Sequence, residues 1–133
     1  MNREQVYYCH FNNKLTEFLK DLIATFPDDK DLKLFKNSFD LLKLSDENKP
    51  AILFNKIIKN FENKIYDKDE SFFLDKDYSN IVDNNVDITT SLIDKLKTNW
   101  INLSVDDKEI VWKYLILLCK LSNKCCGNDV LTR

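Results

Sequence analysis

Apolar residues recur through most of this chain at steps of three and four, the spacing that gathers them on one side of an α-helix. The first run predicts a helix over residues 4–25. Pro27 disfavours helical geometry at the residue before it, so we expect this helix to end there. The apolar side of the helix is formed by Phe11, Leu15, Phe18, Leu19, Leu22 and Phe26.

The same spacing predicts four further helices, over residues 29–44, 50–66, 87–100 and 105–121. Pro50 suits the first turn of the third predicted helix, where its missing N–H costs nothing. Ser104 can cap the last one, and Asp106 and Asp107 favour the positive end of its dipole. The inward side of the second predicted helix is formed by Leu32, Phe35, Phe39 and Leu42.

Two segments depart from this simple pattern. Residues 67–86 mix charged residues with three adjacent apolar ones, which predicts a short helical turn held to the core by its aromatic rings, followed by an acidic, asparagine-rich loop. Between Ile110 and Cys119 the one charged residue is Lys113. A helix that is apolar almost all round is normally buried, so we expect this one at the centre of the fold.

The amino-acid composition also favours a fold made only of helices. One glycine and two prolines in 133 residues leave little material for the tight turns of β-hairpins or phosphate-binding loops. The sequence therefore predicts an all-α fold, a single-domain bundle of about five helices with a nearly fully apolar C-terminal helix at its centre. We expect the bundle to cover residues 1–122 and a flexible tail to cover residues 123–133.

The charge balance limits the classes of partner. Acidic and basic residues nearly cancel, with a net charge of −2, so nucleic acid is not the default partner. The first ten residues carry no apolar run typical of a secretory signal, and the most apolar stretch is about half as long as a membrane span. We expect an intracellular protein, where the thiols of Cys9, Cys119, Cys125 and Cys126 stay reduced.

One segment carries the spacing of a calcium-binding loop, between Asp83 and Asp94. Ile88 stands where such a loop needs glycine, and Asp94 is shorter than the usual bidentate glutamate, so an acidic loop leading into a helix cap is the favoured interpretation. The oxygen ligands at the template positions would be those of Asp83, Asn85, Asp87, Thr89, Ser91 and Asp94.

The sequence contains no pattern typical of a zinc site or of nucleophilic catalysis. His10 is the sole histidine, and Cys9 beside it points to a different side of a helix. No pair of cysteines has the Cys-x-x-Cys spacing, and Cys125 and Cys126 are adjacent in the expected tail. The sequence predicts no metal site, no cofactor and no enzymatic activity.

Two sets of residues are candidates for binding. The apolar set could contact a protein partner, although such residues are more often core residues; it consists of Phe72, Phe73, Leu74 and Trp100. Lys56, Lys59 and Lys64 share one side of the third predicted helix and could contact phosphate. Glu62 and Asp67 interrupt them, which favours an ordinary solvated surface.

Residues 10–27, together with residues 100–104 and 112–115, resemble small all-helical proteins of large nucleocytoplasmic DNA viruses, the giant-virus group. Abundant lysine, asparagine and isoleucine, with few alanines and arginines, indicate an AT-rich genome that fits such a source. The resemblance leaves residues 43–87 unmatched. It implies a viral, intracellular protein and assigns no functional residues.

The leading hypothesis is a non-enzymatic interaction module, acting in the infected host cytoplasm or in the virion. A groove between amphipathic helices would receive a partner's helix or another copy of the bundle. One alternative is a nucleic-acid-associated viral factor that uses the lysine-bearing helix side. Another is a viral Bcl-2-like inhibitor, although Asn99-Trp100 is followed by Ile101 where the usual signature has glycine and arginine.

Overall fold

The computed structural model describes residues 3–74 and 88–127, and within these ranges every regular element is helical. The all-α bundle predicted from the sequence is confirmed. Its elements, including two 3₁₀ turns, are α1 (Arg3–Thr25), α2 (Lys30–Ser45), α3 (Lys49–Ile58), η1 (Lys59–Phe61), α4 (Glu62–Tyr66), α5 (Ser71–Leu74), α6 (Ile88–Asn99), η2 (Trp100–Asn102) and α7 (Val105–Cys125).

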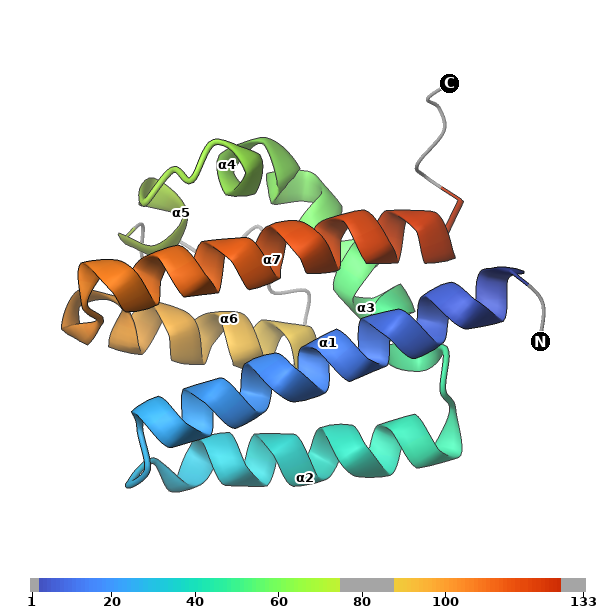
Figure 1. Ribbon diagram of the computed structural model, residues 1–133, viewed down its shortest axis with the longest axis horizontal. Helices are drawn as coiled ribbons and strands as arrows, with labels where there is room; N and C mark the ends of the chain where they lie inside the picture. Colours follow the sequence, from blue (N-terminus) through green and yellow to red (C-terminus); the bar gives the residue numbers. More distant parts are fainter. Residues whose placement is uncertain (1–2, 75–87, 128–133) are drawn as a thin grey trace.

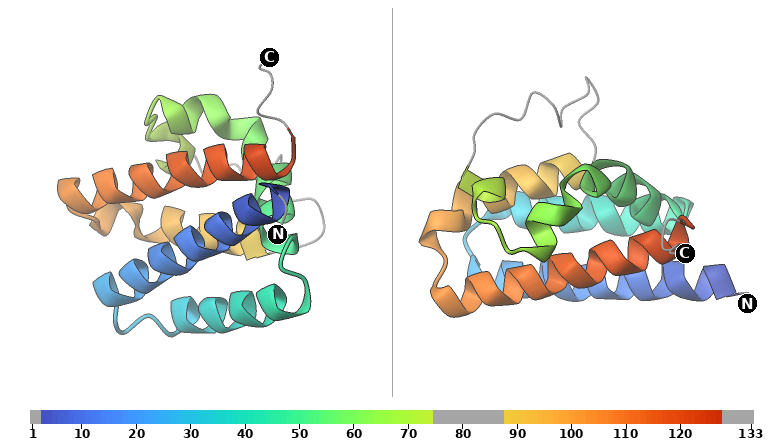
Figure 2. Two further views of the ribbon diagram at one scale, coloured as in Figure 1. Left: turned by 45° about the vertical axis from the view of Figure 1, so that its right-hand side comes forward. Right: turned by 90° about the horizontal axis from the view of Figure 1, so that it is seen from above.

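The long helices form two layers (Figures 1 and 2). Helices α1 and α7 lie side by side in one layer, and α2 and α6 pack together in the other. Helix α3 closes one end of the bundle and contacts α1, α2, α6 and α7. No described helix is long and apolar enough to cross a membrane.

Helix boundaries follow local chemistry. The Asp29 carboxylate accepts hydrogen bonds from the backbone amides of Asp31 (3.0 Å) and Leu32 (3.4 Å), which caps α2. Ser104 Oγ accepts from the Asp107 amide at 3.0 Å, so the predicted cap of α7 is confirmed. Pro50 lies in the first turn of α3, as expected.

The third predicted helix is not continuous. It ends at Ile58, passes through η1 and resumes as the single turn of α4. Phe61 leaves helical geometry (φ −125°, ψ 11°), and its ring packs 5.4 Å from that of Phe72. The break turns the chain so that α4 packs on α7 and the residues after it return to the core.

Helix α7 differs from expectation on its outer side and at its end. Ile110 (44 % exposed) and Leu117 (36 %) face solvent, because no described element covers this side, so the helix is not buried all round. The helix also runs past Leu121 to Cys125, so residues 123–125 of the expected tail are helical. Gly127, at φ 74°, follows it in the left-handed region that favours glycine.

A buried amide fixes this last turn of α7. Asn55 of α3 is buried, and its Nδ2 donates to Ser122 Oγ (3.2 Å) and to Asn123 Oδ1 (2.7 Å). Nearby, the Tyr8 hydroxyl of α1 donates to the Cys125 carbonyl at 3.2 Å. Three helices therefore meet at one end of the bundle through polar groups that satisfy each other.

An aromatic cluster holds the opposite part of the fold together. The ring of Phe73 stacks on Trp100 at 4.1 Å and lies 5.1 Å from Trp112, and the two indoles make an edge contact at 5.3 Å. Trp100 is fully buried, and its Nε1 donates to the Glu70 carboxylate at 2.9 Å. The four-residue helix α5 is thus fixed by its aromatic side chains.

This arrangement gives a first prediction. Phe73→Ala should lower the free energy of unfolding by about 3–5 kcal/mol, because it leaves a cavity between two indoles. Leu74→Ala is the matched control: Leu74 is the next residue and is half exposed, so its loss should cost less than about 1 kcal/mol. Urea denaturation followed by tryptophan fluorescence measures both, and equal effects would contradict this packing.

Candidate functional site

The aromatic residues considered as partner contacts belong to the core. Phe72, Phe73 and Trp100 are all buried, so a partner could not reach their rings in this conformation, and this part of the expectation is corrected. Leu74 alone among the four is half exposed. The physical reason is the cluster itself, since two indoles and two phenyl rings cover each other.

The lysines considered for phosphate do not share one regular helix side. Lys56 lies in α3, Lys59 in η1 and Lys64 in α4, with the chain turning between them. Lys56 and Lys59 are exposed, whereas Lys64 is half-buried. A nucleic-acid role for these residues stays a prediction.

The described part of the chain holds no group of three or more histidine, cysteine, aspartate or glutamate residues that could bind a metal ion. Of the calcium-loop candidates, Asp83, Asn85 and Asp87 lie outside the described residues. The other three template residues lie within helix α6; they are Thr89, Ser91 and Asp94.

The cysteines are free thiols with contrasting surroundings. Burial raises the pKa of Cys119 and of Cys125 to about 12 in each case. Burial also raises the pKa of the half-buried Cys126. A nucleophilic cysteine needs a lowered pKa, so these three thiols are not suited to catalysis.

The most distinctive surface lies on α2, which carries leucines on its solvent side. Leu34, Leu41 and Leu44 are 63 %, 68 % and 83 % exposed. On the opposite side of the same helix, Leu32 and Phe39 are almost completely buried. Helix α2 therefore has a second apolar stripe that nothing in the described structure covers.

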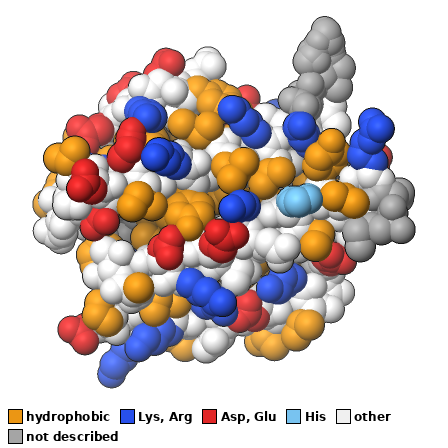
Figure 3. Space-filling view, in the orientation of Figure 1, with side chains coloured by type: hydrophobic (Ala, Val, Ile, Leu, Met, Phe, Trp, Pro, Cys, Tyr) orange, Lys and Arg blue, Asp and Glu red, His pale blue; other side chains and the backbone are white. Residues whose placement is uncertain are grey.

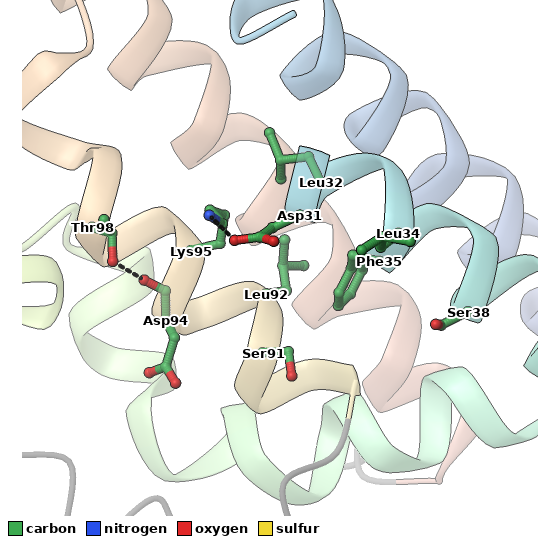
Figure 4. Close-up of a pocket in the computed structure, with 10 residues that line it drawn as sticks. All are labelled: Asp31, Leu32, Leu34, Phe35, Ser38, Ser91, Leu92, Asp94, Lys95 and Thr98. Atoms are coloured by element: carbon green, nitrogen blue, oxygen red, sulfur yellow. Dashed lines mark hydrogen bonds and ion pairs between the residues drawn. The ribbon is translucent and has the colours of Figure 1, made fainter. Parts of the chain in front are cut away.

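Beside this stripe runs a groove of about 590 Å³ between α2 and α6 (Figure 4). Leu34 and Phe35 line it from α2, and Leu92 lines it from α6. The groove is lined by Asp31, Leu32, Leu34, Phe35, Ser38, Ser91, Leu92, Asp94, Lys95 and Thr98.

One end of the groove is closed by an ion-pair network. Lys95 Nζ of α6 lies 3.1 Å from Asp29 Oδ2 and 3.1 Å from Asp31 Oδ2. Burial alone would raise the pKa of Asp29, but the hydrogen bonds from Lys95 and from the Leu32 amide outweigh it and lower that pKa. Burial opposes the charge of Lys95 as well, yet its two carboxylate partners raise its pKa. Lys95 therefore links the two walls of the groove through ion pairs, and its ammonium group is not available as a general base.

A second, weaker apolar surface lies over the α1–α7 layer. Figure 3 shows hydrophobic side chains spread across this face with charged ones between them. The exposed apolar residues of α1 and α7 include Val6, Ile110 and Leu117. The Tyr114 hydroxyl donates to Asp21 at 2.6 Å, and its ring stacks on Phe18 at 4.8 Å, which joins the two helices. Such interleaving of charges is typical of an ordinary protein surface.

Sequence reasoning missed the α2 surface although a signal was present. Leu34, Leu41 and Leu44 are separated by seven and three residues, which places them on one side of a helix. The sequence-based prediction for this helix uses only the inner stripe, from Leu32 to Leu42, and gives the three outer leucines no role.

Comparisons of this chain with protein-family models, with curated proteins and with solved structures found no match. The resemblance to giant-virus proteins and the Bcl-2-like alternative therefore stay predictions. The Bcl-2-like alternative depends on the pair Asn99-Trp100. Asn99 Nδ2 donates to the Lys95 carbonyl of its own helix at 3.1 Å, and Trp100 is in the core.

The ion-pair network predicts a pH dependence. A carboxyl group whose pKa is lowered by folding stabilises the fold above its unfolded pKa of about 4, and this contribution disappears as the pH falls through the folded value. At pH 7, Lys95→Met should lower the free energy of unfolding by about 1 kcal/mol. The difference from the unmodified chain should shrink below about pH 4.

Chemical denaturation between pH 3 and pH 7 measures this difference, with pH values chosen to span the titration of aspartate at about 4. Lys113→Met is the control, because Lys113 is exposed on α7 and forms no ion pair with residues 3–74 or 88–127. A Lys95→Met effect that stays constant from pH 7 to pH 3 would show that the Asp29 pair does not stabilise the fold.

The thiols provide a separate prediction. In the folded protein at pH 8, a disulfide-exchange reagent should modify Cys9 first and should leave Cys119 and Cys125 unmodified, because burial both blocks access and suppresses the thiolate. Peptide mass spectrometry locates the modified residues, and all four should react in denaturant. Rapid modification of Cys119 in the folded state would contradict its placement.

Proposed function

We propose that this protein is a non-enzymatic interaction module of a large DNA virus, and that it binds a helix of another chain along the outer stripe of α2 and the adjoining α2–α6 groove. The observation that carries the proposal is the exposure of the outer stripe of α2. Three leucines lie there on one side of a single helix, each more than 60 % exposed. The infected cytoplasm or the virion is the setting that the sequence resemblance implies.

The energy of burial supports a binding role for this stripe. Burying a fully exposed leucine side chain contributes about 1.5–3 kcal/mol of free energy. Leu34, Leu41 and Leu44 are exposed in the isolated chain, so most of this contribution becomes available when a partner covers them. Single exposed leucines are ordinary, whereas apolar residues gathered on one surface are typical of interaction sites.

The shape of the groove supports a helix as its occupant. Two nearly parallel walls, α2 and α6, border an apolar floor that includes Phe35 and Leu92. Amphipathic helices bind in such grooves by placing apolar side chains at steps of three and four residues. Ser38, Ser91 and Thr98 on the rim can bond to polar groups of the partner.

Chemistry at the groove gives no support to catalysis. Lys95 is held by two aspartates, and the hydroxyl of Ser38 or Ser91 has no histidine among the groove residues to activate it. Recognition is the activity that these side chains can perform.

Position-specific cross-linking tests the proposal. A photoreactive benzoylphenylalanine in place of Ser38, in the groove, should link the protein to another polypeptide in its native cell, because the groove places that side chain against the partner. Adding Leu41→Glu to the same chain should remove most of the product, since it places a charge in the apolar stripe.

The matched control is the same photoreactive residue in place of Lys113, which is exposed on α7 away from the groove. Equal yields from the two positions, or a Ser38 product that Leu41→Glu leaves unchanged, would refute a binding role for this surface.

A further inference from the structure

We infer that the chain that covers the outer stripe of α2 is a second copy of this protein, joined through an antiparallel pair of α2 helices. This inference rests on the binding role proposed for the α2–α6 surface and identifies the partner. It makes the protein a two-fold symmetric dimer whose interface is the same stripe on each copy.

The spacing of the stripe fits pairing with another helix. Leu34, Leu41 and Leu44 are separated by seven and three residues, and polar Asn37 occupies the position between the first two that completes a spacing of three, four and three, the pattern by which helices pack at a shallow angle. The residues Ser38 and Ser45 beside them are also uncharged, in a chain that is 32 % charged. Leu32 and Phe39 on the opposite side of α2 are buried in the core, so the outer stripe faces away from the core.

Two-fold symmetry matches this stripe with itself. In an antiparallel pair centred beside Phe39, Leu34 of one copy lies opposite Leu44 of the other. The same symmetry places Asn37 opposite Leu41, and every contact occurs twice. The seam from Leu34 to Leu44 is about 15 Å long, which is short for an interface, so we expect a dimer of micromolar rather than nanomolar affinity.

Charges at the two ends of α2 select this orientation. Lys30 and Lys33 are exposed at its beginning, and Asp46 and Glu47 are exposed just after its end. An antiparallel pair brings the lysines of each copy to the acidic residues of the other, whereas a parallel pair would bring lysine to lysine.

Neighbouring charges reduce this complementarity. Asp28 is exposed just before α2, and Lys49 is exposed two residues after Glu47. At the beginning of α2, Asp29 and Asp31 are both bound to Lys95 of their own chain, whose single positive charge balances one of them. At its end, Lys43 lies 3.7 Å from Asp40, with which it pairs.

Sedimentation equilibrium of the full chain, from micromolar to near-millimolar concentration, tests the inference. The unmodified protein should pass from monomer to dimer. Leu41→Glu should weaken the dimer at least about 100-fold, because the symmetric interface then contains two charges in an apolar seam. Ile101→Glu is the matched control, since Ile101 is 74 % exposed on η2 and should leave the dimer unchanged.

Charge reversal tests the orientation. Lys33→Glu should weaken the dimer several-fold, and adding Glu47→Lys to the same chain should restore it, because symmetry then pairs the reversed charges. Circular dichroism confirms that each variant folds. A dimer that the double variant fails to restore would overturn the antiparallel arrangement.

The remaining outcomes separate this inference from the proposed function. A chain that is monomeric at every concentration overturns the second copy as the partner, and cross-linking of Ser38 to a foreign polypeptide would then assign the groove to that polypeptide. A dimer disrupted equally by Leu41→Glu and Ile101→Glu overturns the placement of the interface. A monomer that cross-links to nothing overturns both proposals.

Discussion

A helix can turn only one side toward a core, and α2 carries large apolar residues on two. Leu32 and Phe39 fill the space between α2 and its neighbours and are almost completely buried. Rotating the helix to bury Leu34 and Leu41 instead would expose these two. The fold therefore buries one apolar stripe of α2 and leaves the other to contact solvent or another chain. This constraint underlies the binding role proposed for the protein.

The rest of the molecule keeps that surface in place. Helix α6, the other wall of the groove, continues directly into η2, where Trp100 is held between Phe73 and Trp112. At the far end of the bundle, Asn55 ties α3 to the last turn of α7. Helix α2 packs against α1 and α3, and Lys95 joins α2 and α6 at one end of the groove. A groove built in this way is pre-organised, which lowers the entropic cost of binding.

The sequence was sufficient for most of the helices and for where they begin, because caps and stripes are local. Ser104 and Pro50 marked the starts of α7 and α3 without knowledge of the fold. The break at η1 depends on Phe61 meeting Phe72, a contact between residues eleven apart that periodicity does not contain. Burial of Trp100 and exposure of Leu117 depend likewise on which helices become neighbours.

The α2 surface was predictable only in part, for a related reason. The recurrence of Leu34, Leu41 and Leu44 can be read from the sequence, but an amphipathic pattern does not say which of two apolar stripes meets the core. That choice is made by packing against α1, α3 and α6. The sequence can therefore nominate the residues of such a site, and the spatial order of the helices decides that they are exposed.

The central claim is that a second copy of this chain covers the outer stripe of α2, and the leucine methyl groups report this directly. Methyl NMR with a water-soluble paramagnetic agent measures the solvent contact of each leucine. In concentrated solution, Leu34, Leu41 and Leu44 should be protected from the agent while Leu117 on α7 stays accessible, and dilution should expose all four. Methyl groups of the three α2 leucines that remain as accessible as those of Leu117 at every concentration would contradict it.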